Sequence, residues 1–313
     1  MTTATSAVHV TRDQFNLKWD PAIPPIATVP SGSVVTFDCL DASGGQLTAT
    51  STVQDLLALD FERVDQVNGP VAVEGAKAGD TLQVDLLEFT PADWGWTASI
   101  PGFGLLADVF TEPALRITRL PAIGGLAEFL PGIRVPVIPF CGEIGVAPPD
   151  GPRSTIPPDT FGGNMDTRHL TAGSTLFLPV FHDGARLSIG DGHAAQGDGE
   201  VSGTAIETPM QVQLRLTVRT DVHVTAPEFL TPSGAAAEQP VGRRYVTDGV
   251  GPDLMTAARD ATRRMIDWLG HEHALAPIDA YLLCSVAVDL RISEIVDMPN
   301  VIVSAHCPLS IFD

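Results

Sequence analysis

An acidic, glycine-rich segment at positions 190–207 carries the residue types best suited to chemistry in this chain. It reads GDGHAAQGDGEVSGTAIE and holds Asp191, His193 and Glu207, with no Lys or Arg to balance the charge. If the segment is extended, Asp191 and His193 point to the same side, because alternate residues of a strand share a face. A carboxylate oxygen beside an imidazole nitrogen is a common pair of ligands for zinc or another divalent cation. We therefore expect a metal site here, with a solvated hairpin loop as the alternative.

The glycines of this segment widen the range of backbone conformations that it can adopt. Because glycine readily adopts positive φ angles, we expect Gly190, Gly192, Gly197 and Gly199 to let the chain approach a ligand closely. The D-x-[DN]-x-[DN]-G pattern of calcium loops is absent. If the return stretch EVSGTAIE forms a hairpin with IGDGH, Glu207 comes back beside the start of the segment. A carboxylate there could bind the metal directly, or act as a base one water molecule away.

Polar residues that suit a site occur in three further stretches. FGGNMDTRHL contains Asn164 and Asp166, CLDASGGQ contains Asp41, and CGEIGVAP contains Glu143. If Glu143 is buried without a cation its pKa is raised, which suits a general acid or base. Because loops at one rim of a sheet carry function, we expect Asp41 and Asp166 to meet the acidic segment in one pocket. A capping or turn role is the alternative for each residue.

Several familiar catalytic motifs are absent. The chain has no G-x-S-x-G elbow of a serine hydrolase, no P-loop and no Rossmann fingerprint. Its cysteines stand singly, which argues against a disulfide framework and against a structural zinc knuckle. We expect reduced thiols at Cys39, Cys141, Cys284 and Cys307.

The composition of the 313 residues is that of a globular protein, with 44% hydrophobic and 18% charged residues. Lys and Arg number 18 against 38 Asp and Glu, which gives a formal net charge of −20. Such a charge argues against nucleic acid and anionic membranes as partners, since both need basic patches. The N-terminus has no apolar core of signal-peptide length, and no run reaches the roughly 18 apolar residues of a membrane span. We expect a cytoplasmic protein.

Strand-like sequence dominates the first two thirds of the chain. Strands are predicted for SGSVVTFDCLD, TLQVDLLEF, STLFLPVF and MQVQLRLTV. In TLQVDLLEF polar and apolar residues alternate, which is typical of a strand with one solvent-exposed face and one buried face. The stretch WGWTASIPGFGLLADVF mixes aromatic residues with Gly and Pro, and we expect a loop there. NVIVSAHCPLSIF predicts a last strand.

Helical periodicity is confined to the last third. DLMTAARDATRRMIDWLG places apolar residues on one helical face, with Asp253 as N-cap and Gly270 as the stop. PIDAYLLCSVAVDL predicts a second, more buried helix after Pro277. The sequence thus predicts an α+β fold, predominantly β with sandwich- or barrel-like sheets and a few helices in the C-terminal third. We expect one compact domain over residues 1–313.

Taken together, these segments resemble the acetamidase/formamidase family. The resemblance runs in order through PPIATVPSGSVVTFDCLDASGGQL, GPVAVEGAKAGDTLQVDLLE, GEIGVAPPDG, GGNMDTRHL, GDGHAAQGDGEVSGTAIE and AYLLCSVAVDLRISEIVDMPNVIVS. It implies a hydrolase that cleaves a short aliphatic amide to a carboxylate and ammonia, in a mostly β fold that forms homo-oligomers, dimers or larger. It also implies a divalent metal near these motifs, with zinc as the expected ion and calcium as the alternative.

On this basis the expected site has three parts. The metal ligands are Asp41, Asp191 and His193, the catalytic carboxyl groups are Glu143, Glu207 and Asp166, and the substrate-binding residues are Asn164 and Gln196. Two other functions use the same residues. One is a non-catalytic β-protein that binds a divalent cation through the acidic segment, and the other is a metal-free amidase that uses a Glu and Cys141.

Overall fold

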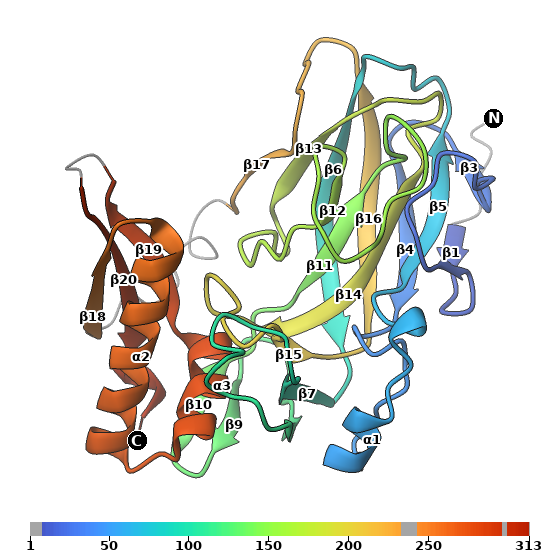
Figure 1. Cartoon of the computed structure of the whole chain (residues 1–313). Coiled ribbons are helices and arrows are strands. Elements are labelled where there is room, and N and C mark those ends of the chain that lie inside the picture. Colours follow the sequence, from blue (N-terminus) through green and yellow to red (C-terminus); the bar gives the residue numbers. More distant parts are fainter. Residues whose placement is uncertain (1–7, 233–242, 296–298, 313) are drawn as a thin grey trace.

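The structure is a computed structural model that describes residues 8–232, 243–295 and 299–312 (Figure 1). A six-stranded sheet forms one layer, with neighbouring strands in the order β1-β4-β16-β6-β13-β17. β1 pairs with β4 in parallel, and the other pairs in this sheet are antiparallel. The strands are β1 (Val8–Val10), β4 (Ser33–Cys39), β16 (Met210–Arg219), β6 (Thr81–Pro91), β13 (Thr175–Pro179) and β17 (Glu228–Leu230).

A nine-stranded sheet forms the second layer and carries the acidic segment. Its main path is β12-β11-β14-β15-β7-β8, and β5 joins it at β14 and pairs with β2 and β3. These strands are β12 (Gly162–Asn164), β11 (Phe140–Gly145), β14 (Leu187–Ala195), β15 (Ile206–Glu207), β7 (Trp94–Ser99), β8 (Ala114–Arg119), β5 (Val67–Val73), β2 (Phe15–Asn16) and β3 (Ala27–Val29).

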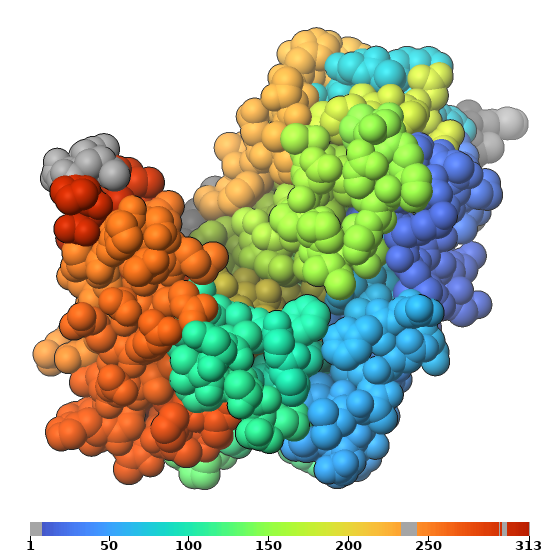
Figure 2. All heavy atoms as spheres, viewed as in Figure 1, coloured from blue at the N-terminus to red at the C-terminus, as the bar shows by residue number. Residues whose placement is uncertain are grey.

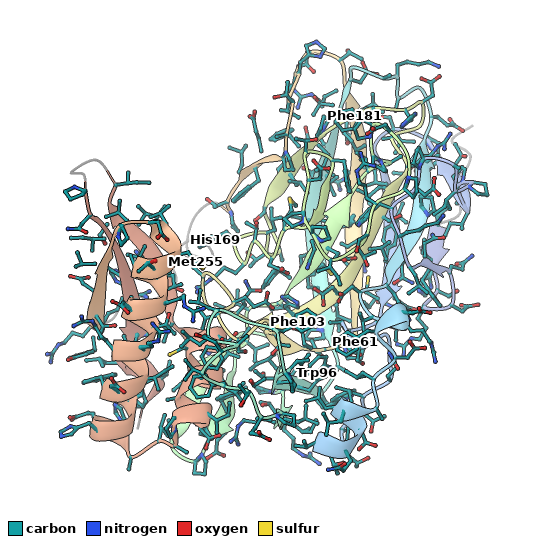
Figure 3. The ribbon with its side chains drawn as sticks, in the orientation of Figure 1. Phe61, Trp96, Phe103, His169, Phe181 and Met255 are labelled. Atoms are coloured by element: carbon teal, nitrogen blue, oxygen red, sulfur yellow. The ribbon has the colours of Figure 1, made fainter. Side chains whose placement is uncertain are left out.

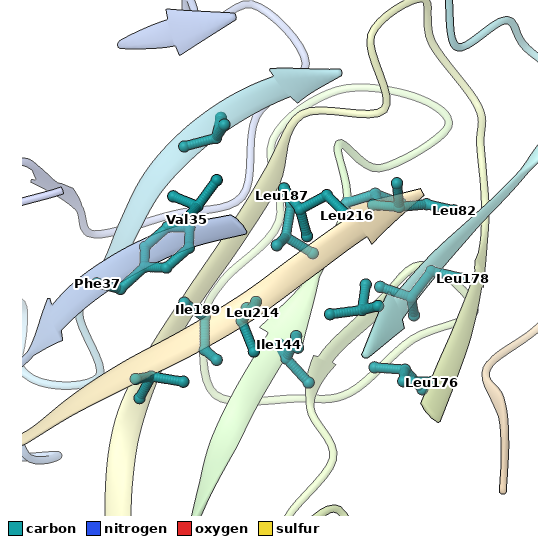
Figure 4. Close-up of a cluster of buried hydrophobic side chains, with 14 of the residues drawn as sticks. Val35, Phe37, Leu82, Ile144, Leu176, Leu178, Leu187, Ile189, Leu214 and Leu216 are labelled. Carbon is teal, nitrogen blue, oxygen red and sulfur yellow. The ribbon is translucent and has the colours of Figure 1, made fainter. Parts of the chain in front are cut away.

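The main hydrophobic core lies between these two sheets. Side chains from the six-stranded sheet, among them Phe37, Leu82 and Leu214, face Leu187 and Ile189 of β14 (Figure 4). Every residue of β14 is buried, because one face packs on this core and the other faces the polar interior described below. Full burial of each large aliphatic side chain contributes about 1.5–3 kcal/mol. The acidic segment is therefore held by a strand with little freedom to move.

A C-terminal layer packs against the far end of the nine-stranded sheet (Figures 1 and 2). Two helices and a three-stranded sheet of order β18-β20-β19 share a second core with a small hairpin. The elements are α2 (Leu254–His273), α3 (Pro277–Ala287), β18 (Arg244–Gly251), β20 (Val301–Pro308), β19 (Asp289–Glu294), β9 (Leu126–Leu130) and β10 (Ile133–Pro136). The short helical segments are α1 (Val53–Leu57), η1 (Phe61–Arg63) and η3 (Leu309–Ile311).

The predicted fold class, a mostly β α+β protein with its main helices in the last third, is confirmed, although no barrel closes among the strands that the structure describes. The Asp253 cap is also confirmed, since its carboxylate accepts a hydrogen bond from the Thr256 N–H at 2.8 Å. The helix does not stop at Gly270 as expected. It continues to His273 and ends where Ala274 takes a left-handed φ of 53°.

The stretch expected to be a loop over 94–110 is partly a strand. Its first six residues form β7, which pairs with β8 along its full length and meets β15 at Trp96. Cross-strand pairing and burial of Trp96 thus override the Gly and Pro that follow in the sequence. In the described part of the chain, no helix combines the length and apolar character needed to cross a bilayer.

Candidate active site

Four neighbouring strands each place one residue in a row across the nine-stranded sheet. His193 of β14 lies opposite Phe140 of β11 on one side and Glu207 of β15 on the other. Glu207 in turn lies opposite Trp96 of β7. The expected return of the chain that brings Glu207 beside the acidic segment is therefore confirmed. This row, buried at every position, forms the centre of the candidate site.

The two ring nitrogens of His193 have different surroundings. Nδ1 lies 2.8 Å from Oε1 of Gln196, and the Gln196 amide nitrogen donates to the carbonyl oxygen of Asp166 at 2.8 Å. The second bond fixes the amide so that its oxygen accepts the Nδ1 proton. Nε2 lies 2.9 Å from Oδ2 of Asp191 and 3.1 Å from Oε2 of Glu207. Because Nε2 faces two carboxylates, a cation, either a proton or a metal, must lie on that side of the ring.

The backbone of Asp191 departs from regular strand geometry where its side chain contacts His193. The two side chains converge as expected, but Asp191 has a left-handed φ of 55° rather than an extended backbone. Asp65, Asp166 and Glu200 near the same pocket also have positive φ angles, of 50°, 46° and 41°. Such conformations cost about 1–3 kcal/mol each and persist where the surrounding structure imposes them. In this site, backbone strain is therefore concentrated at acidic residues.

The glycines around these acids act mainly through their lack of a side chain. Of the four glycines expected to take positive φ, only Gly199 does so, at 100°. A Cβ on Gly190, Gly192 or Gly197 would instead fall closer than 3.0 Å to a backbone carbonyl oxygen of a neighbouring segment. The positive φ expected for these three was wrong, because close packing of β14 and the following turn requires the missing Cβ.

Gly142, which no sequence motif marks, makes room for the acids directly. A Cβ at this position would fall closer than 3.0 Å to Oδ1 of Asp166 and to Oδ2 of Asp191. It would also lie 3.0 Å from Cε1 of His193. The two carboxylates therefore occupy the volume that any other residue would fill at position 142.

The site holds many more acids than bases. Burial, reinforced by Asp191 and Asp166, raises the pKa of Asp65 to about 8. Burial also raises the pKa of Asp166 to about 6, although the charge of His193 opposes the rise. The pKa values of three further carboxyl groups lie well above their usual range, again chiefly through burial: Glu143, Glu200 and Glu207.

The central ion pair behaves differently. Burial acts to raise the pKa of Asp191, but the charge of His193 and hydrogen bonds outweigh it, so this pKa lies below its usual value. Burial acts to lower the pKa of His193, and the carboxylates of Asp191 and Glu207 raise it well above 6.5. Several buried oxygens have no hydrogen-bond partner within the described ranges: Oδ1 of Asp166, Oδ1 of Asp191 and both carboxyl oxygens of Glu143. One histidine thus faces a cluster of acids with free oxygen atoms.

Part of this cluster has the geometry of a metal site. Ligand atoms of Asp166, Asp191 and His193 lie within 4.8 Å of one another, and so do those of His193, Glu200 and Glu207. An imidazole nitrogen with carboxylate oxygens suits zinc and other divalent cations. Gln196 on the remote nitrogen of His193 is the kind of outer contact that orients a metal-binding histidine. The free carboxylate oxygens and the crowding at Gly142 fit a cation that draws these groups together.

The remaining expected residues lie around this cluster. Asp41 belongs to neither group of converging ligand atoms. Its Oδ1 accepts hydrogen bonds from the indole of Trp96 at 2.9 Å and from Ser43, so Asp41 contacts the row of site residues through Trp96. Glu143 is fully buried on β11, opposite Asn164 of β12. Gln196 uses both polar ends of its amide group on His193 and on the backbone of Asp166.

A pocket of about 110 Å³ opens above the cluster. Its polar floor comprises Asp65, Asn164, Asp166, Asp191, Glu200 and Glu207. Figure 3 shows Trp96 below Phe61 and Phe103, and all three residues line this pocket. Asp65 and the aromatic residues were missed because no local motif marks them. Glu200 lies within the acidic segment, and its place in QGDGE was the signal available.

Comparison with known proteins gives a consistent picture. The sequence model described as the Acetamidase/Formamidase family matches residues 3–152 and 149–313. A putative formamidase of Schizosaccharomyces pombe is 28% identical over 96% of this chain and 91% of its own. A formamidase of Methylophilus methylotrophus is 27% identical over 96% and 90%.

Solved structures agree with these sequence relatives. A gamma lactamase from Delftia acidovorans superposes with a TM-score of 0.88 at 26% identity, covering 96% of this chain and 90% of that one. An acetamidase from Bacillus halodurans has a TM-score of 0.70 at 31% identity, covering 97% and 98%.

Proposed function

The chain belongs to the acetamidase/formamidase family and is an amidase, and we propose that it cleaves a short aliphatic amide to a carboxylate and ammonia in the pocket above His193. We further propose that a divalent cation, zinc in this account, is held by Asp166, Asp191 and His193. The observation that carries this proposal is the position of Nε2 of His193 between two carboxylates, in a cluster where Oδ1 of Asp166 and Oδ1 of Asp191 have no hydrogen-bond partner among the described residues. A dication would compensate this excess of negative charge.

The chemistry that such a cation supplies when bound is Lewis-acid polarisation of the amide carbonyl and acidification of a water molecule. The protein's own residues do the rest. Gln196 keeps the Nδ1 proton of His193 in place, so that Nε2 points to the carboxylates. Asn164 lines the pocket, and its amide oxygen has no hydrogen-bond partner in the described part of the chain. Its NH₂ group is a donor suited to the substrate carbonyl oxygen.

Glu207 is the general base in this account. Its Oε1 is fixed by the N–H of Ala205 at 2.7 Å, which leaves Oε2 directed towards His193 and the pocket. Oε2 takes a proton from the attacking water and returns it to the amide nitrogen, which leaves as ammonia. Burial raises the pKa of Glu207, and a cation bound beside it would oppose that rise and favour the carboxylate form that accepts the proton.

Asp166 and Glu143 complete the acidic surroundings. Asp166 lines the pocket and is placed to bind the cation rather than to transfer the proton. Glu143, whose pKa is raised well above its usual value by burial, is neutral in this account and adds no charge to the floor. Asp41 acts through Trp96, whose ring it anchors at the pocket wall.

Two rival functions find less support. A catalytic Cys141 would need a thiolate, but burial and the neighbouring Cys39 raise the pKa of its thiol well above 9.0. Its side chain is also absent from the pocket lining. A cation-binding protein without catalysis would not need the pocket that opens beside Glu207.

A cyclic amide is a second substrate class to test, because the gamma lactamase superposes with a TM-score of 0.88.

Three broader expectations remain proposals. We propose that the chain forms homo-oligomers and acts in the cytoplasm. We also propose that it folds as a single domain. The single domain is supported by the buried carboxylate of Asp289 on β19, which pairs with Arg168 from the segment between β12 and β13 and with Arg244 on β18.

An ammonia-release assay tests the proposed function. The purified protein is incubated with formamide, acetamide, propionamide and a γ-lactam, before and after treatment with a chelator. We expect ammonia from at least one linear amide and its loss on chelation; for the lactam, ring opening is followed by the appearance of the amino acid. Tight cation binding without hydrolysis of any amide would indicate the non-catalytic function. Activity that survives complete chelation would refute the role of the cation.

A further inference from the structure

The pocket above His193 has a polar side, formed by its acidic floor with Ser43 and Thr204, and an apolar side. Its walls are apolar and come from separate segments: Phe61, Trp96, Ile100, Phe103 and Ile156. The amide group of a substrate needs the polar floor, and formamide has no acyl chain beyond its amide group. The apolar walls therefore have no partner in the smallest amides, and this part of the pocket calls for a ligand with an apolar group.

Two phenylalanines at the mouth of the pocket stand out. The rings of Phe61 and Phe103 stack with their centroids 5.8 Å apart and their planes 13° from parallel (Figure 3). Their exposed fractions are 47% and 42%, so each ring leaves a large apolar surface in water. In the space-filling view, the segments around residues 60, 103 and 156 meet on one face of the molecule (Figure 2). An apolar group bound in the pocket against the two rings would remove part of this surface from water.

The segment that carries Phe103 is anchored beside the acids of the pocket floor. The N–H of Leu105 donates to the carbonyl oxygen of Val201 at 2.8 Å, one residue after Glu200. The N–H of Leu106 donates to the hydroxyl of Tyr281 at 2.9 Å. Phe103 is thus fixed at both the polar floor and the C-terminal layer.

The segment that carries Phe61 is anchored on the opposite side. The backbone of Asp60 exchanges two hydrogen bonds with the side chain of Gln46, at 2.9 and 3.1 Å. The N–H of Asp65 donates to the carbonyl oxygen of Ala42 at 2.9 Å. Because both segments are tied to the frame of the site, the two rings are preorganised, which reduces the entropy lost when a ligand binds.

We propose that this amidase prefers amides with an apolar acyl chain of about three to five carbons over formamide, and that Phe61 and Phe103 contact that chain. The inference rests on the proposed amide hydrolysis and names its substrate class. The pocket volume of about 110 Å³ is several times the roughly 10–15 Å³ that one water molecule needs, so it has room beyond the three non-hydrogen atoms of formamide. Burial of each added methylene favours binding by about fourfold.

A chain-length series tests this proposal. The value of kcat/KM is measured for formamide, acetamide, propionamide and butyramide, on the full chain and on Phe61→Ala and Phe103→Ala. From acetamide to butyramide the wild type should gain about 15-fold, corresponding to two methylenes. In each variant the butyramide-to-acetamide ratio should fall to about 4 or less. The matched control is Phe229→Ala, an exposed phenylalanine on β17 outside the pocket, which should keep the wild-type ratio.

Each outcome decides the matter. Hydrolysis of formamide with rates that fall steadily as the chain grows would overturn the acyl-chain proposal and leave the proposed function intact. Equal losses on all four amides in the Phe variants would show that the rings support the fold rather than select the chain. If no amide is hydrolysed at all, the proposed function itself is wrong and the acyl-chain proposal falls with it. A partial return of the ratio in Phe103→Leu would support an apolar contact.

Discussion

Replacement of Gly142 by Ala is expected to damage the site without unfolding the protein. The added Cβ would lie closer than 3.0 Å to one carboxylate oxygen of Asp166 and one of Asp191, whereas ordinary contacts begin at 3.4 Å. Both groups must therefore move by at least about 0.4 Å, or the β11 backbone must shift. Because a misplacement of about 1 Å in a catalytic site costs on the order of 100-fold, we expect kcat/KM to fall between about 10- and 100-fold.

The Gly142→Ala protein should also bind the divalent cation more weakly, since both displaced carboxylates are proposed ligands. Overpacking of this kind destabilises by about 1–3 kcal/mol, which the thermal unfolding temperature records. The matched control is Gly270→Ala in α2, where the nearest atom to an added Cβ is at 3.4 Å and the helix should gain up to about 1 kcal/mol. Wild-type metal content and turnover in Gly142→Ala would refute the packing argument for the site.

Three further predictions concern individual residues. Glu207→Gln should keep its metal and lose kcat by about 10²–10⁴-fold, which metal analysis and steady-state kinetics check; loss of metal together with rate would make Glu207 a ligand instead. Gln196→Ala should weaken metal affinity by about 10–100-fold, because the Nδ1 side of His193 loses its acceptor, and a competition titration with a chelating dye measures this change. Cys141→Ala should retain activity within about threefold in the ammonia assay, and a loss of 100-fold or more would revive the thiol mechanism.

The sequence predicted the residues of the site better than their geometry. Asp191, His193 and Glu207 could be found because they share one short acidic segment, and only ten residues separate the end of β14 at Ala195 from the start of β15 at Ile206, so pairing of the two strands could be expected. The left-handed φ of Asp191 could not be foreseen, since Asp adopts that conformation only when the surrounding structure imposes it. Position 142 reads as an ordinary glycine in a strand, and its importance depends on acids that lie far away in the sequence.

The rest of the pocket depends on contacts between distant segments. Asp65 precedes β5 in an unremarkable stretch, and its elevated pKa arises from burial and from Asp191 and Asp166. The Gly and Pro that follow Trp96 predict a loop, yet the pairing of Trp96 opposite Glu207 fixes the pocket wall. The fold class was within reach because the alternation of strands such as β6 and the 3.6-residue period of α2 are local signals.

Stoichiometric reactivation by a divalent cation tests the central claim most directly. The wild-type protein is stripped of metal, titrated with zinc, and assayed for bound metal and for amide hydrolysis at each addition, with His193→Ala treated in the same way. We predict that activity rises in proportion to bound zinc up to one ion per chain, and that His193→Ala neither binds zinc tightly nor regains activity. Full hydrolysis by the stripped protein, or normal binding and turnover in His193→Ala, would contradict the account.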